Sequence, residues 1–253
     1  MEVHAHTHTE RKKFTHYLWE FLMLFLAVFC GFLAEYQLEQ TIEHNREKQF
    51  MRSIIEDLKT DTATIRTILD DIEVRSHCID SMLFLLVPND VSEEAVKKSY
   101  SFTYPALNNL PLVFNDRTIT QLKNAGNMRL IRNQKVNDGI IQYWNQVEVI
   151  SKAMDRHMAY RTKGREMETV IFNVAKIFLD NNRRVNDPET PVQLVSHDKT
   201  LIRQYANVIA YCGVMLNSLL EQITEQKKLA EELIDLIKKE YHLSAVGRTL
   251  SEK

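Results

Sequence analysis

The sequence contains few of the residues that interrupt helices. Glycine occurs six times and proline five times among 253 residues, which is well below their average usage. Leucine, isoleucine, glutamate, lysine and glutamine are abundant instead, so we expect long helices joined by few turns. No segment shows the apolar–polar alternation that is typical of a β-strand.

The chain also lacks an excess of charge of either sign. It carries 32 Lys and Arg residues against 34 Asp and Glu residues, a formal net charge of −2. Proteins that bind nucleic acid usually carry a basic excess, because contacts to phosphate dominate their affinity. We therefore expect no nucleic-acid partner.

Cysteine is scarce, and its three positions match neither a disulfide framework nor a zinc site. Cys30 lies in a hydrophobic segment. Cys78 and Cys212 could pair with each other in an oxidising compartment. The alternative is that both are free thiols that fill apolar core, as free cysteine usually does.

Catalytic and cofactor-binding motifs are absent from the sequence. It contains no Gly-rich phosphate loop, His-Glu-x-x-His, Gly-x-Ser-x-Gly or Cys-x-x-Cys motif. The Glu-x-x-His pair of di-iron bundles is missing as well. We therefore expect that the protein is not an enzyme and that it holds no cofactor.

An apolar stretch without a charge runs from Phe21 to Ala34, with glutamates close to both ends. Counted outward to the amphipathic residues, 14–38 would form about 37 Å of helix, enough to cross a bilayer. Tyr17, Trp19 and Tyr36 fall where an aromatic belt belongs. The sequence therefore predicts a transmembrane helix over 14–38.

Two alternatives for this segment are a cleaved signal peptide and a soluble core helix. Cleavage after Ala34 would place Phe32 at the −3 position, where a small residue is needed. Basic residues precede the segment and acidic residues follow it, which is the positive-inside pattern. The basic residues are Arg11, Lys12 and Lys13, and the acidic residues are Glu35, Glu39 and Glu43. We expect an uncleaved single span with a cytoplasmic N-terminus.

One face of the predicted span contains small residues together with an acid. Residues on this face recur every three or four positions, which aligns them on a helix; they are Glu20, Leu24, Ala27, Gly31 and Ala34, with Glu35 at the edge. Small residues in such a row let a second helix approach closely. Glu20 could reach the membrane surface near His16, pair with a base of the partner, or handle a proton or ion.

The N-terminal tail contains alternating histidines at His4, His6 and His8. Imidazoles at this spacing could bind zinc, copper or nickel, although no further ligand completes a structural site. The alternative is an ordinary mobile tail.

The remainder of the chain carries two strong heptad patterns. One occupies Met51, Ile55, Leu58, Thr62, Ile65, Leu69, Ile72, Ser76, Ile79, Leu83 and Leu86. The other occupies Leu201, Tyr205, Val208, Cys212, Met215, Leu219, Gln222, Gln226, Leu229, Leu233 and Leu236. The charged residues between the first set are interpreted as a solvated outer face.

Turn residues divide this region into helices. We expect the first helix to stop near Pro88, a short helix from Ser92 to about Ser101, and a structured loop over 102–115. Asp116 should cap a short helix that stops at Gly126. Two long helices, 134–179 and 198–241, should follow.

These elements predict an all-α protein in which a transmembrane helix precedes an elongated antiparallel bundle of three long helices and several short ones. The expected domains are a cytoplasmic tail (1–13), the span (14–38), the bundle (39–242) and a flexible C-terminal tail (243–253). A pocket between helices is the hypothesis for Trp144, His157 and Tyr104, close to the 102–115 loop.

Several segments resemble an uncharacterised family of bacterial single-span membrane proteins. The segments are the His-rich basic start, EFLMLFLAVFCGFLAE, REKQFMRSIIEDLKTD and DRTITQLKNAGNMRLIRN. Glu20 and Glu35 match the acids that bracket that family's span, and Arg117, Gly126 and Arg129 fall in its loop–helix motif. Phe29 stands where the family often has a small residue or Thr. The resemblance implies an inner-membrane protein with a periplasmic domain. The family has no assigned activity, so no catalytic residues carry over to this chain.

Three functions remain open from the sequence. The first is a membrane-anchored interaction or scaffolding module that binds another membrane protein or a second copy of itself. The second is a ligand-sensing periplasmic bundle that signals through a partner. The third is an accessory subunit of a transporter or channel that uses Glu20.

Overall fold

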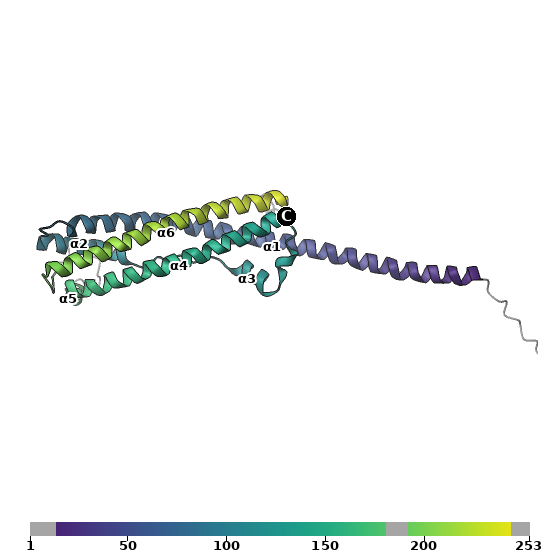
Figure 1. Ribbon diagram of the computed structural model, residues 1–253, viewed down its shortest axis with the longest axis horizontal. Coiled ribbons are helices and arrows are strands. Elements are labelled where there is room, and N and C mark those ends of the chain that lie inside the picture. The colour runs from purple at the N-terminus through teal and green to yellow at the C-terminus, as the bar shows by residue number, and fades with distance from the viewer. Residues whose placement is uncertain (1–13, 181–191, 244–253) are drawn as a thin grey trace, which may run out of the picture. The chain divides into compact units, whose positions relative to one another are not determined.

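The computed structural model describes residues 14–180 and 192–243, and every element in these ranges is helical (Figure 1). The elements are α1 (Phe14–Leu86), α2 (Glu93–Leu107), α3 (Arg117–Asn124), the 3₁₀ helix η1 (Asn127–Leu130), α4 (Gln134–Ile171), α5 (Val174–Asp180) and α6 (Lys199–Glu240). The predicted all-α fold is confirmed. The one extended pairing in the described ranges is a single bridge between Phe172 and Leu194.

The chain divides into two compact units, residues 1–50 and 51–253, and α1 runs through both. The described part of the first unit is helix alone, from Phe14 to Phe50. The polar residues from Glu39 to Gln49 continue the helix without a turn. They contain neither glycine nor proline, so nothing in the sequence stops α1 there.

The second unit is a helical bundle in which α6 runs antiparallel to α4 (Figure 1). Their opposite ends meet, since the Asn133 side chain at the start of α4 donates to Glu240 at the end of α6. Residues of α1 and α4 pair in parallel register, with Asp61 bonded to Tyr143. The chain therefore returns between α1 and α4 through α2, the 108–116 segment and α3.

The core of the bundle lies under the two predicted heptads. All eleven α1 positions and all eleven α6 positions are buried or half-buried, as predicted. Ile65, Ile72, Leu216 and Ile223 are among the side chains with no exposed surface. Burying each such side chain stabilises the fold by about 1.5–3 kcal/mol, so these two faces account for the packing of the long helices.

Helix α2 extends six residues further than expected, through Pro105 to Leu107. Proline in a helix removes one backbone hydrogen bond and usually kinks the helix. Here Thr103, Ala106 and Leu107 are all buried, so packing around the proline offsets the lost bond. Of the expected loop 102–115, only residues 108–115 are non-helical.

Helix α4 ends at Ile171, earlier than the predicted Leu179, because Phe172 adopts an extended backbone conformation. The backbone N–H of Asn173 donates to Gln193 and that of Val195 donates to Ile171. The Asn173 side chain then accepts from Lys176 N–H and starts α5. An asparagine at this point is a helix-start signal that the sequence prediction missed.

Candidate functional site

The predicted interface residues of the span lie on one continuous, exposed stretch of α1. Leu24, Ala27, Gly31, Ala34 and Glu35 are exposed, and Glu20 is half-buried with its carboxylate 3.1 Å from His16. A Cβ added to Gly31 would have no atom within 4 Å. The face is therefore open to a second helix in the described structure.

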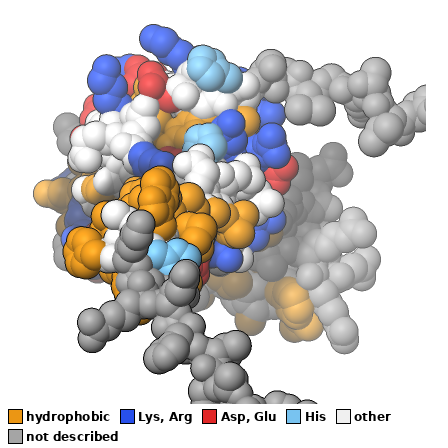
Figure 2. All heavy atoms as spheres, turned by 90° about the vertical axis from the view of Figure 1, so that its right-hand side faces the viewer, with side chains coloured by type: hydrophobic (Ala, Val, Ile, Leu, Met, Phe, Trp, Pro, Cys, Tyr) orange, Lys and Arg blue, Asp and Glu red, His pale blue; other side chains and the backbone are white. Residues whose placement is uncertain are grey.

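Helix α1 is long and apolar enough, by length and composition, to span a membrane. The most apolar stretch of this helix is not buried in the protein, whereas a soluble core helix would be mostly covered. Figure 2 views the molecule from the right-hand side of Figure 1, and hydrophobic side chains, in orange, gather at and just below the centre of that view. The predicted topology residues Arg11, Lys12 and Lys13, and the histidines His4, His6 and His8, lie outside the described residues.

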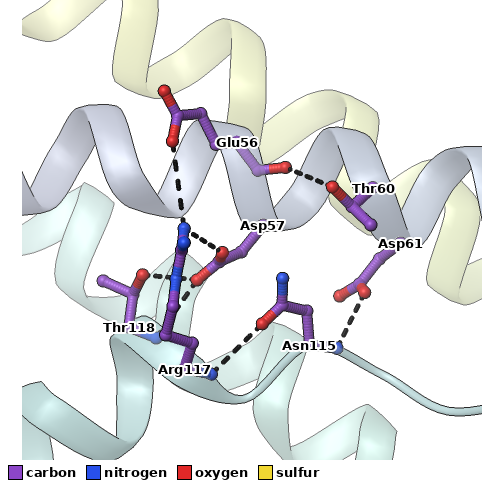
Figure 3. Close-up of polar contacts among 7 residues, drawn as sticks. All are labelled: Glu56, Asp57, Thr60, Asp61, Asn115, Arg117 and Thr118. Atoms are coloured by element: carbon purple, nitrogen blue, oxygen red, sulfur yellow. Dashed lines mark hydrogen bonds and ion pairs between the residues drawn. The ribbon is translucent and has the colours of Figure 1, made fainter.

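In the bundle, two carboxylates of α1 hold the segment that leads into α3 (Figure 3). Asp57 accepts hydrogen bonds from the side-chain hydroxyl and the backbone N–H of Thr118, the latter at 3.1 Å. It also pairs with the Arg117 guanidinium at 2.7 Å. Asp57 therefore satisfies one of the free N–H groups at the start of α3, that of Thr118. The expected cap, Asp116, makes no such bond, which corrects the sequence prediction.

Asp61 lies one turn further along α1 and fixes the same segment. Its carboxylate accepts from the backbone N–H of Asn115 at 2.8 Å and from the hydroxyl of Tyr143 at 2.7 Å. The side chain of Gln226 donates to the Tyr143 carbonyl oxygen. Asp57, Asp61, Asn115, Arg117, Thr118 and Tyr143, here called the aspartate clamp, thus join α1, α3 and α4.

Burial controls the ionisation of the clamp. Asp61 is 2% exposed, and burial raises its pKa above the ordinary 3.8 although the Tyr143 and Asn115 hydrogen bonds act in the opposite direction. The negative charge of Asp57 raises that pKa further. Burial, together with the charge of Asp61, also raises the pKa of Tyr143. The Tyr143 hydroxyl therefore remains a donor at neutral pH.

A raised carboxyl pKa has a definite consequence for stability. Ionised Asp61 disfavours the folded state above its folded pKa, and this penalty disappears as the pH falls toward 3.8. We therefore expect that the free energy of unfolding of the wild-type chain, relative to that of Asp61→Asn, increases as the pH falls from 7 to 4. Chemical unfolding of both proteins at the two pH values measures this difference, and an unchanged difference would contradict the assignment.

A small cavity adjoins the clamp and is lined by Trp144. Its volume is about 20 Å³, which is room for roughly one water molecule. Asp61, Asn115 and Tyr143 also line it, together with Ile140 and other apolar side chains. Of the three residues predicted to form a pocket, Trp144 alone lines this cavity.

The other two predicted pocket residues lie elsewhere. His157 is thirteen residues beyond Trp144 on α4, about 20 Å along the helix, and is 3% exposed. Tyr104 is on α2 and exposed, with the Arg165 guanidinium 5.7 Å from its ring centroid. Tyr104 is thus connected to a second polar cluster, and the structure does not bring the three residues around one cavity.

That second cluster consists of Arg75, Arg161 and Arg165 around the carbonyl oxygens of 107–109, here called the arginine junction. Arg75 donates to Asn108 O at 2.6 Å, to Asn109 O at 2.9 Å and to the Asp71 carboxylate. Arg161 and Arg165 both donate to Leu107 O at 3.4 Å. Cations at the C-terminus of a helix satisfy its free carbonyls and complement its dipole, so the junction stabilises the end of α2.

Glu168 extends the junction into the core. It is 3% exposed and accepts from Thr103 at 3.2 Å and from Arg165 at 3.1 Å. Burial raises its pKa, although both partners act in the opposite direction. The buried hydroxyls of Tyr100 and Tyr205 have no hydrogen-bond partner within the described residues, and burial raises the pKa of Tyr100 to about 12.

The sequence prediction missed both clusters because it assigned the charged residues of α1 to a solvated face. Asp57, Asp61 and Arg75 are instead buried. A usable signal was present: Ile54, Leu58, Asp61, Ile65, Ile68, Ile72, Arg75, Ile79, Met82 and Leu86 form a second, unbroken series of spacings of four and three. The buried face of α1 is therefore wider than one heptad stripe.

No metal site or disulfide occurs among the described residues. These ranges contain no group of three or more His, Cys, Asp and Glu side chains that could hold an ion. Cys30, Cys78 and Cys212 are free thiols, and burial raises the pKa of Cys212 to about 12. The two alternatives for Cys78 and Cys212 were a disulfide and two free thiols, and in the structure both are free thiols.

The chain was compared with family models, with curated proteins and with solved structures, and none of them matches. The resemblance to a family of bacterial single-span membrane proteins thus stays a hypothesis.

Proposed function

We propose that this chain is a membrane-anchored interaction module whose span binds a second membrane helix. The observation that carries the proposal is the apolar stretch of α1, whose most hydrophobic window is 0% buried. An exposed apolar helix of this length is expensive in water and stable in a bilayer. The partner is another membrane protein or a second copy of this chain.

The row from Leu24 to Ala34 supports a helical partner. Without a hydrophobic force between helices in lipid, close backbone approach through small side chains supplies the attraction. Ala27 and Gly31 are one turn apart on this row, and space is open above Gly31. Glu20 continues the row and would be shielded from lipid at such an interface.

The cavity beside Trp144 is too small to be the ligand pocket that the sequence predicts at this position. About 20 Å³ admits one water molecule and excludes drug-sized ligands, whose pockets are roughly 300 Å³ or larger. The aspartate clamp and the arginine junction are occupied by contacts within the chain. Their evident role is to hold the bundle together.

The proposed location is a bacterial inner membrane, with the N-terminus in the cytoplasm and the bundle in the periplasm. It rests on the charge asymmetry across the span, basic at 11–13 and acidic at Glu35, Glu39 and Glu43. Protease added to cells with a permeabilised outer membrane should digest the bundle. Digestion only after the inner membrane is opened would reverse the orientation.

Gly31→Leu is expected to reduce recovery of the partner helix at least tenfold, because the new side chain keeps the two backbones apart. Mild-detergent purification followed by mass spectrometry measures what remains bound, including a second copy of the chain. Leu33→Phe is the matched control, since it adds bulk about 160° away from Gly31 around the helix. Equal recovery with Gly31→Leu and Leu33→Phe would contradict the proposed interface.

A further inference from the structure

His157 lies in the interior of the bundle with a ring nitrogen that has no acceptor. Its side chain is 3% exposed, and Nε2 is buried without a hydrogen-bond partner within the described residues. Burial, together with the positive charges of Arg161 and Arg75, lowers its pKa from 6.5 to about 4. His157 is therefore neutral at pH 7, and a proton added to it would be buried among cations.

Charged and titratable groups reach this region from each long helix. Arg75 comes from α1, where it is bonded to Asp71, and Arg161 lies one turn beyond His157 on α4. Arg165 follows on α4 and is paired with Glu168. The α6 groups that interact with these charges are Cys212 and Tyr205, and the α2 group is Tyr100.

The two cations that act on His157 are two of the three that hold residues 107–109; the third, Arg165, binds Leu107 alone. Arg75 binds the carbonyl oxygens of Asn108 and Asn109, and Arg161 binds that of Leu107. A third positive charge in this place repels both guanidinium groups. The end of α2 is partly accessible, with Asn109 exposed, so water can replace these bonds when the arginines move.

Lowering the pH stabilises the folded state through the buried carboxylates of the bundle, which is the opposite of its effect through His157. Burial raises the pKa of Asp61 and of Glu168, so protonation of either group is easier in the folded state than in the unfolded chain. For His157 the folded pKa is depressed, and stability is lost as the pH falls from 6.5 toward about 4. Among these three groups, the histidine alone weakens the bundle in mild acid.

We propose that the arginine junction is an acid-sensitive latch: a proton on His157 releases residues 107–109 from Arg75 and Arg161. The aspartate clamp and the packing of α4 against α6 remain in place. The 108–116 segment is then held at its Asn115 end and free at its Asn108 end. Its buried side, which includes Leu112, becomes accessible in acid.

The expected size follows from the pKa difference. Burial is the main cause of the lowered pKa, so acid favours opening to the extent that water reaches His157 once residues 107–109 are released. Full access of water would restore the ordinary pKa of 6.5 and make opening roughly fifty-fold more favourable between pH 7 and pH 4.5, which is the upper limit of the effect. Amide hydrogen exchange of the full chain in detergent measures this opening, after correction for the intrinsic effect of pH. We expect faster exchange in peptides covering 104–114, and unchanged protection in the middle of α6.

His157→Gln should remove the pH response, because glutamine does not titrate in this range. His77→Gln is the matched control, since His77 is exposed on α1, and it should retain the full response. A response that persists in His157→Gln, or an equal increase of exchange in α6, would overturn the latch.

A measurement on the wild-type chain covers the case in which His157→Gln does not fold. Histidine-selective labelling lets NMR report the ionisation of His157 directly. The latch requires that this ring titrates well below 6.5, and that opening of residues 107–109 follows the same titration. An ordinary pKa, or opening at a different pH, would overturn it.

Discussion

Asp57→Ala is expected to lower the free energy of unfolding of the bundle by about 3 kcal/mol. The substitution leaves two buried donors of Thr118, the backbone N–H and the hydroxyl, without an acceptor. Thr118 is 2% exposed, so water cannot readily replace the carboxylate. Arg117 contributes less to this cost, because its exposed guanidinium can be hydrated.

Chemical unfolding of the full chain in detergent, followed by circular dichroism, measures this loss. Asp70→Ala is the matched control, since Asp70 is exposed on the same helix and surface changes usually alter stability by less than about 0.5 kcal/mol. A loss below about 1 kcal/mol for Asp57→Ala would show that the clamp does not stabilise α3.

Arg75→Ala is expected to lower the free energy of unfolding of the bundle by a similar amount, about 3 kcal/mol, for a different reason. Arg75 is 4% exposed, and its guanidinium binds two carbonyl oxygens beyond α2 and the Asp71 carboxylate. The substitution removes these charge-assisted bonds and the packing of the buried side-chain stem. The end of α2 should lose protection from hydrogen exchange first.

Arg66→Ala provides the comparison on the same helix. Arg66 is largely exposed and lies 3.7 Å from Glu231, so its loss should cost less than about 1 kcal/mol. Equal effects of Arg66→Ala and Arg75→Ala would mean that the buried bonds of Arg75 contribute no net stability.

The long helices were predictable because their core faces repeat regularly over many turns. The predicted α6, 198–241, matches the observed Lys199–Glu240 within one residue at each end. Asp198 starts the helix by accepting from Thr200 N–H, as an N-cap residue does.

The second apolar series of α1 could have predicted that Asp61 and Arg75 are buried, but not which residues pair with them, because those partners are distant in the sequence. Asp61 binds Tyr143 across 82 positions, and no local pattern records this pairing. Burying a charge normally costs free energy, so the charged residues of α1 were expected to face solvent. Only after the 108–116 segment is placed beside α1 do Asp57 and Arg75 acquire the partners that make their burial tolerable.

The extension of α2 through Pro105 has a similar cause. Proline and asparagine lower helix propensity locally, and the sequence therefore favoured a loop. In the fold, Leu107 packs against Gly164 of α4, whose missing side chain makes room for it. Tertiary packing overrides the local preference here, as it commonly does for short helices.

The distance in sequence between α1 and α6 also determines how the chain must be made. The apolar face of α1 belongs to the same core as residues of α6, which are synthesised more than a hundred positions later. From Leu86 to Glu240 a ribosome needs roughly 8–30 s at typical rates. Until α6 is made, the part of the isoleucine-rich α1 face that α6 covers stays exposed, which makes the nascent chain prone to aggregate.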